Sequence, residues 1–183
     1  MIFTRNKSGQ MEAVGLVVIV ILITLGMLFM AQFALKESPT KKIFTRKGLA
    51  YSTMSSLMKT TVTDNCVQNL RQDSLPQIGK DLLEDCALHA DTMPEGYSLY
   101  RCGGKHSCAY VNKTVSELLE ETLGTWHKKY EFVSEIIPFE GRAIELLRIG
   151  EGCPKTKERD SSGNFPIPVE GAGLVQNVLY VCE

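Results

Sequence analysis

The sequence has few histidines and none of the familiar catalytic motifs. It contains three histidines in 183 residues. It has no G-x-S-x-G elbow, no phosphate-binding G-x-x-x-x-G-K-[ST] loop, no H-E-x-x-H helix and no dinucleotide-binding fingerprint. A hydrolase built from this chain would have to rely on scattered carboxylates. We therefore expect a protein that is not an enzyme and that holds no cofactor.

Charge is absent from one long stretch and unevenly distributed over the rest. Residues 13–35 are 23 consecutive positions without Asp, Glu, Lys or Arg. Residues 36–60 carry six basic side chains and one acidic one, whereas residues 61–183 carry 12 basic and 19 acidic ones. Nucleic-acid binding requires a basic surface that neutralises phosphates. The acidic C-terminal part therefore argues against a nucleic-acid partner.

The uncharged run predicts a single membrane-spanning helix. At about 1.5 Å per residue it is long enough to cross a hydrocarbon core of about 30 Å. A buried core helix of this length would have a polar stripe, which is missing here. The chain then divides into a basic leader (residues 1–12), a transmembrane helix (13–35), a juxtamembrane amphipathic helix or stalk (36–60) and a C-terminal α+β domain (61–183).

Two features predict that the C-terminal domain lies outside the cytoplasm. Arg5 and Lys7 precede the apolar run and favour a cytoplasmic N-terminus, although residues 36–60 are more basic still. All six cysteines follow the run, and six cysteines in a domain of this size suit an oxidising compartment. Asn112 begins the glycosylation sequon Asn-Lys-Thr. We expect a single-pass protein of the cell membrane whose partner is membrane lipid.

Hydrophobic periodicity predicts an α+β fold, with one main helix packed on an antiparallel sheet of three or four strands. That helix is expected to begin at Thr114, with Glu117 completing a capping box and Trp126 in the core. Residues 130–137, 142–149 and 174–182 are predicted strands. Residues 151–173 are expected to form an exposed loop, in which residues 165–168 lie extended over the sheet. Glu84 and Asp85 are expected on a solvated helix face. The apolar face of residues 41–60 either packs on its own domain or contacts a neighbour.

The six cysteines are disulfide candidates, and sequence alone allows fifteen pairings. The favoured pair is Cys153 with Cys182, at the ends of two predicted strands. The remaining four would pair among themselves: Cys66, Cys86, Cys102 and Cys108. A zinc site made of Cys102, His106 and Cys108 with His89 is the alternative, but its spacing is not that of a known zinc motif. We expect disulfides and no metal.

The sequence Arg5-Asn6-Lys7-Ser8-Gly9-Gln10-Met11-Glu12, followed at once by the apolar run, resembles the class III signal of type IV pilins, particularly archaeal pilin-like proteins. In that family a basic leader is removed, and the uncut helix anchors the subunit and later forms a filament core. The resemblance implies that Gly9 precedes the cut, that Gln10 becomes the N-terminus and that Glu12 pairs with a neighbour's terminal amine. The family places this acid at the fifth mature position, whereas here it would be the third.

Two functions are compatible with these patterns. The first is a pilin-like structural or adhesive surface subunit, whose apolar helix associates with copies of itself in a surface filament. The second is a membrane-tethered domain that binds a ligand or partner without polymerising. Retention of the residues before Gln10 in the native protein would favour the second.

Overall fold

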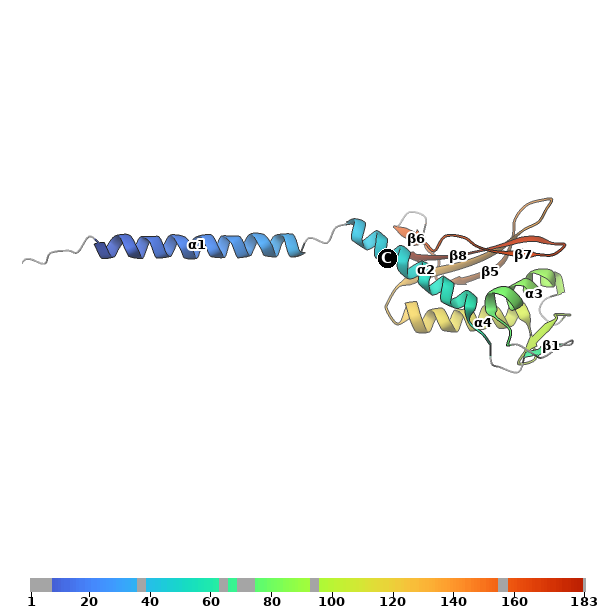
Figure 1. The fold of residues 1–183 in the computed structure, drawn as a ribbon. Helices are drawn as coiled ribbons and strands as arrows, with labels where there is room; N and C mark the ends of the chain where they lie inside the picture. The colour runs from blue at the N-terminus through green and yellow to red at the C-terminus, as the bar shows by residue number, and fades with distance from the viewer. Residues whose placement is uncertain are drawn as a thin grey trace, which may run out of the picture. The chain divides into compact units, whose positions relative to one another are not determined.

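The computed structural model describes residues 8–35, 39–62, 66–68, 75–92, 96–154 and 158–182. The chain divides into two compact units, Met1–Lys42 and Ile43–Glu183. We refer to the second as the C-terminal unit and describe each unit by itself. The ribbon is shown in Figure 1.

The N-terminal unit contains helix α1, Ser8–Leu35. Every side chain from Val14 to Phe33 is exposed in this unit, and the mean hydropathy of this stretch is 2.9. Thr24 satisfies its hydroxyl locally, because Oγ1 donates to the Ile21 carbonyl at 2.9 Å. By length and composition, α1 could cross a membrane.

Helix α2, Pro39–Lys59, begins with a proline, which is favoured in the first helical turn because its nitrogen needs no partner there. Ala50, Met54 and Leu57 are spaced by three or four residues and are buried in the core of the C-terminal unit. Of the two interpretations open from the sequence, the structure supports the one in which α2 packs on its own domain.

A five-stranded antiparallel sheet forms the centre of the C-terminal unit. Its strands are connected in the order β5-β4-β8-β6, with β7 also paired to β8. The sheet has one or two strands more than the sequence predicted. The bounds of its strands are β4 Lys129–Ile137, β5 Ile144–Gly150, β6 Arg159–Ser161, β7 Phe165–Val169 and β8 Gly173–Cys182.

Strands β6 and β7 run along the same side of β8 and are separated by a bulge. Arg159 pairs with Cys182 and Phe165 pairs with Asn177, so the register shifts by one residue between the two strands. Ser162 occupies the bulge, where its backbone N donates to Leu179 O at 2.8 Å and its Oγ accepts from Leu179 N at 3.0 Å. The prediction of an exposed loop over residues 151–173 was therefore wrong. Residues 165–168 form an edge strand of the sheet rather than lying over it.

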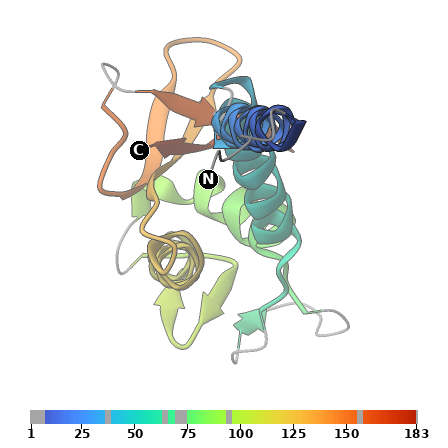
Figure 2. The same cartoon turned by 90° about the vertical axis from the view of Figure 1, so that its left-hand side faces the viewer.

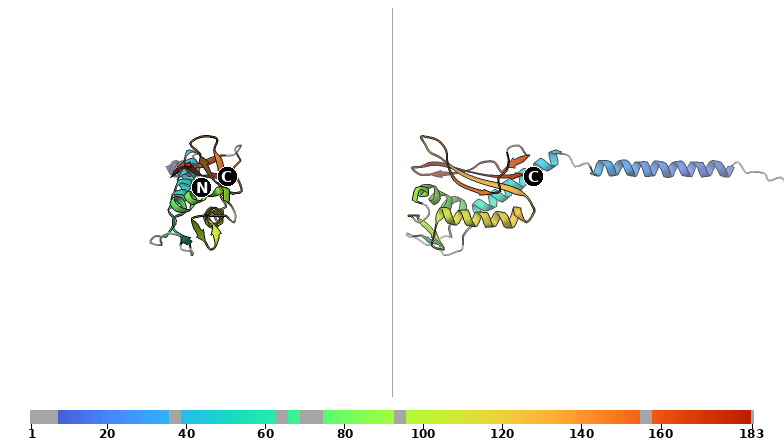
Figure 3. Two further views of the ribbon diagram at one scale, coloured as in Figure 1. Left: turned by 90° about the vertical axis from the view of Figure 1, so that its right-hand side faces the viewer. Right: turned by 180° about the vertical axis from the view of Figure 1, so that it is seen from behind.

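All helices of the C-terminal unit that pack on the large sheet lie on one of its faces, as Figures 1 and 2 show. The view from behind in Figure 3 shows the same arrangement, with no described helix on the opposite face. The helical segments that follow α2 are η1 Ile78–Leu82, α3 Leu83–Leu88, η2 Ala90–Thr92, α4 Ser107–Leu119 and η3 Glu120–Gly124.

The core lies between this helical layer and the sheet. Phe132, Leu179 and Met54 are completely buried there, and side chains of this size each contribute about 1.5–3 kcal/mol when buried. A second, three-stranded sheet is formed by β1 Cys66–Gln68, β2 Tyr100–Cys102 and β3 Lys105–His106.

The main helix begins earlier than the sequence predicted. Helix α4 starts at Ser107, because the ring nitrogen Nδ1 of His106 accepts from Cys108 N at 3.2 Å and caps it. Thr114 lies in its interior, so the predicted capping box was wrong. The helix then widens into the π-helical turn η3, which inserts a residue and rotates the following side chains by about 100°. Trp126 is therefore 61% exposed rather than part of the core.

Candidate functional site

The residues of the predicted leader lie at the edge of the described structure. Gly9, Gln10 and Glu12 fall in the first turns of α1. Their side chains, and the whole of Arg5 and Lys7, lie outside the described part. Cleavage after Gly9 and pairing of Glu12 with a neighbour remain predictions.

All six cysteines of the C-terminal unit are in disulfides. The bridges are Cys66–Cys102, Cys86–Cys108 and Cys153–Cys182. The third joins the two positions that the sequence analysis preferred, because Cys182 ends β8 and Cys153 closely follows β5. Neither Cys102 nor Cys108 keeps a thiolate for a metal ion, so the zinc alternative loses two of its four ligands.

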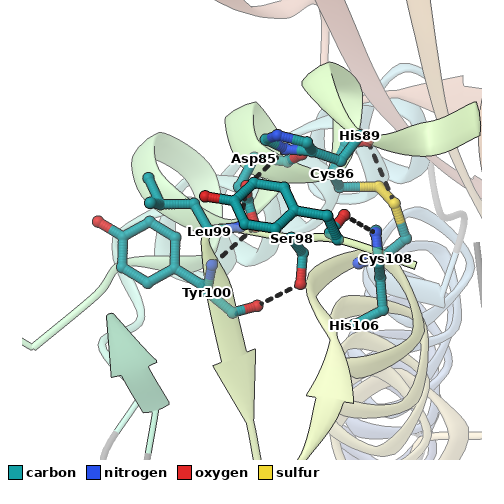
Figure 4. The surroundings of a disulfide bond; sticks show 9 residues. Asp85, Cys86, His89, Ser98, Leu99, Tyr100, His106 and Cys108 are labelled. Carbon is teal, nitrogen blue, oxygen red and sulfur yellow. Dashed lines mark hydrogen bonds and ion pairs between the residues drawn. A yellow bond between two sulfur atoms is a disulfide. The ribbon is translucent and has the colours of Figure 1, made fainter. Parts of the chain in front are cut away.

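The surroundings of the Cys86–Cys108 bridge explain two of the histidines (Figure 4). His106 is buried and its Nε2 lies 3.1 Å from Tyr97 O. His89 Nδ1 lies 2.8 Å from Asp85 Oδ1. Each ring nitrogen with a described contact is thus used to hold local structure.

Asp85 connects α3 to the small sheet. Its carboxylate accepts from Leu99 N at 2.9 Å and from Tyr100 N at 3.0 Å, and the residue is only 3% exposed. The expectation that Asp85 lies on a solvated face was wrong, because these two amides replace the water that a buried carboxylate loses. Its neighbour Glu84 is partly exposed. The pKa of Glu84 is raised, mainly because its carboxyl group is partly buried and also because the charge of Asp81 repels it.

Asn112 of the predicted sequon is exposed on α4. Lys113 beside it lies 3.6 Å from Glu117, one helical turn further on. The side chain of Asn112 therefore lies at the surface, and its glycosylation remains a prediction.

The helix-free face of the large sheet contains a polar hollow of about 350 Å³. Its floor is a buried acid: Glu131 of β4 is 7% exposed and binds the guanidinium of Arg148 from β5. The second oxygen of Glu131 accepts from Cys153 N at 3.2 Å. Arg148 also donates from Nε to Glu145 at 2.9 Å, and this bond lowers the pKa of Glu145 and raises that of Arg148.

The walls of this hollow combine groups able to bind a small polar ligand. The guanidinium of Arg159 lies 4.6 Å from the centre of the Tyr180 ring, a cation–π contact. Glu135, Asn164 and Gln176 line the same hollow and have no side-chain hydrogen bond within the described part of the chain. A carboxylate, two amides and an aromatic ring can together bind several hydroxyl or amide groups of one ligand.

This hollow was not predicted from the sequence. Its polar residues come from β4, β5, β6, β8 and the bulge between β6 and β7, and they meet only through the strand register. The available signal was weak: Glu131 and Glu135 have the spacing of one strand face, and Arg148 lies on the next strand.

Comparison of this chain with protein-family models, with curated proteins and with solved structures finds no match. Any functional inference therefore depends on the residues described above.

Proposed function

We propose that this chain is a membrane-anchored, pilin-like surface subunit that does structural or adhesive work through its disulfide-bonded C-terminal unit. The observation that carries this proposal is helix α1, in which all side chains from Val14 to Phe33 are exposed and apolar or nearly so. Such a surface is stable only in lipid or against other apolar helices. The leader-like residues before it support the pilin-like interpretation.

The three disulfides support a location outside the cytoplasm for the C-terminal unit. Disulfides persist in oxidising compartments and are rare where glutathione keeps thiols reduced. No free cysteine occurs in this unit. Labelling of intact cells with a membrane-impermeant amine reagent should therefore modify lysines of this unit.

Processing of the N-terminus tests the pilin-like part of the proposal. Intact-mass measurement of the chain, produced with a peptidase that removes class III leaders, should find Gln10 as the first residue. Gly9→Val should block the cut, because the family cleaves after a small residue. Gly15→Val, six positions further into α1, is the matched control and should be cut normally. A native chain that retains Met1 to Gly9 would contradict the proposal.

The hollow on the sheet favours a second candidate function, a membrane-tethered domain that binds a small polar ligand. Binding by Glu135, Asn164 and Gln176 would not require a filament. A screen of saccharides and amino-acid derivatives by ligand-observed NMR, repeated with Gln176→Ala, would test it. Loss of a detected signal in this variant is the expected result. A signal that survives both Gln176→Ala and Asn164→Ala would place the ligand elsewhere.

A further inference from the structure

The large sheet has two edges, and only one of them is blocked by prolines and a covering helix. At the β6–β7 edge, Pro166 and Pro168 alternate along β7. Proline has no N–H, and in edge strands its nitrogen faces away from the neighbouring strand. The outer side of β7 therefore lacks donors at these positions. Helix α2 also packs at this edge, where Arg46 contacts Asp160 and Tyr51 contacts Phe165.

The opposite edge, strand β5, has neither prolines nor a covering helix, although its pairing with β4 is interrupted by a bulge at Leu146. Its seven residues contain no proline. One side of β5 pairs with β4, and no backbone hydrogen bond from the other side reaches any described residue. Ile144, at the start of the strand, is 59% exposed. An edge without prolines or a covering helix, and with an exposed apolar side chain, can serve as a template for adding a strand.

We propose that β5 pairs in antiparallel orientation with β5 of a second copy of this chain, so that two C-terminal units form one continuous sheet. The charges of β5 favour a particular register. With the two-fold axis between Leu146 and Leu147, Glu145 of each copy lies opposite Arg148 of the other. Opposite charges at directly facing positions stabilise antiparallel pairs. Both side chains lie on the helix-free face, because Glu145 pairs with Glu135 and Arg148 pairs with Val133 on either side of the bulge at Leu146.

The same register accounts for the exposed isoleucine. Ile144 pairs with Ile136 and Ile149 pairs with Phe132, so both isoleucines lie on the helix-covered face. Across the two-fold axis Ile144 faces Ile149 of the second copy, which buries Ile144 against another apolar side chain. Each copy thus supplies Arg148 and Ile149 to Glu145 and Ile144 of the other copy, as a symmetric interface requires.

This pairing concerns the C-terminal unit and does not depend on what α1 does. It would add a contact between subunits that is separate from any association of the apolar helices. An anchor in a common membrane would strengthen it, because tethering raises the effective concentration of the two strands.

The test compares three forms of the full-length chain in detergent micelles. The first is unchanged. The second, Ile144→Lys, places a charge in the proposed interface at a position that is exposed in the single copy. The third, Phe44→Lys, changes a side chain that is 81% exposed on α2, at the opposite edge. Sedimentation equilibrium in density-matched solvent gives the dimerisation constant. Hydrogen exchange of residues 144–150 reports on the free amides of β5.

We expect dimers for the unchanged chain and for Phe44→Lys. For Ile144→Lys we expect the dissociation constant of the dimer to be at least about tenfold larger. Amides of β5 should exchange faster in Ile144→Lys than in Phe44→Lys. Glu145→Arg, which places like charges opposite each other, should weaken the dimer as well and serves if Ile144→Lys does not fold. A monomeric unchanged chain would overturn the proposal. So would a dimer that folded Ile144→Lys or Glu145→Arg leaves as tight as in Phe44→Lys, because such a dimer forms through another surface.

Discussion

Arg46 and Asp160 are 114 positions apart in the sequence and form a buried ion pair, with 2.8 Å between Nε and Oδ2. The pair joins α2 to the edge strand β6. Arg46 also donates to Glu158, whose side chain is 73% exposed. The part of α2 around Arg46 is thus held to strand β6 by an ion pair from which water is excluded.

Removing the acid of this buried pair should destabilise the C-terminal unit strongly. We expect Asp160→Asn to lower the free energy of unfolding by about 3 kcal/mol or more, because the guanidinium of Arg46 stays buried with less compensation. Glu158→Gln is the control and should change it by less than about 0.5 kcal/mol, since that carboxylate is exposed. Urea unfolding followed by near-ultraviolet circular dichroism measures both. Equal effects would contradict a dominant role for Asp160.

The bridge between Cys153 and Cys182 should contribute about 3–4 kcal/mol to stability. It closes a loop across 29 positions and restricts the unfolded chain by the corresponding entropy. Replacing both residues by alanine should lower the free energy of unfolding by this amount. Non-reducing peptide mapping of the unchanged chain should recover the three bridges seen here. Any other pairing in the native protein would be inconsistent with this fold.

The phenol of Tyr130 should ionise later than an ordinary tyrosine. The pKa of Tyr130 is raised to about 12, mainly by burial and also by the hydrogen bond of 3.0 Å that its hydroxyl donates to Glu120. Because the folded state holds this proton more tightly than the unfolded state, the resulting stability is complete below pH 10. It is lost as the pH rises through 12.

Ultraviolet titration of the phenolates tests this expectation. The component that titrates near pH 12 should disappear in Tyr130→Phe. In Glu120→Gln the midpoint of that component should fall, since the neighbouring carboxylate no longer favours the neutral phenol. A midpoint unchanged in Glu120→Gln would assign the shift to burial alone.

Gly173 should tolerate no side chain at the start of β8. Its φ is +128°, and an added Cβ would lie 2.2 Å from the carbonyl oxygen of Ile137. Gly173→Ala should therefore cost about 4 kcal/mol or more, from strain and from displacement of β4. Gly163 has a φ of +79° but open space around it, so Gly163→Ala should cost only about 1 kcal/mol. Thermal unfolding of the two variants separates the steric effect from the conformational one.

Trp126 should contribute little to folding although it is the only tryptophan. It is 61% exposed beyond the π-helical turn. We expect Trp126→Ala to change the free energy of unfolding by less than about 1 kcal/mol. Acrylamide should quench its fluorescence almost as well in the folded as in the unfolded protein. Strong protection from the quencher in the folded protein would place Trp126 in a contact that this structure lacks.

The sequence predicts the features of this fold that depend on local pattern. The apolar run of α1, the amphipathic face of α2 and strands β4, β5 and β8 follow from periodicity. The pairing of Cys153 with Cys182 followed from placing the two cysteines at the ends of two predicted strands. The helices and strands were predictable because each depends on residues that are close together in the sequence.

Features that depend on distant contacts were not predicted. The start of α4 is set by the His106 ring, which replaces the usual capping side chain. The burial of Asp85 depends on amides 14 and 15 positions away. Strands β6 and β7 are rich in polar residues or proline and form because β8 offers a free edge. The hollow around Glu131 depends on the register of four strands, and this register cannot be predicted from amino-acid composition.

The contact between Arg46 and Asp160 marks the end of the sheet at which the C-terminal unit can be extended. Asp160 pairs with Val181, one residue before Cys182, so the polypeptide enters and leaves this unit at the same end of the sheet. A fluorescent protein or epitope fused to the C-terminus would emerge on the side of the unit where Arg46 of α2 contacts Asp160. Such a reporter would not cover the hairpin between β4 and β5, which lies at the other end of the sheet and would stay accessible to binding partners.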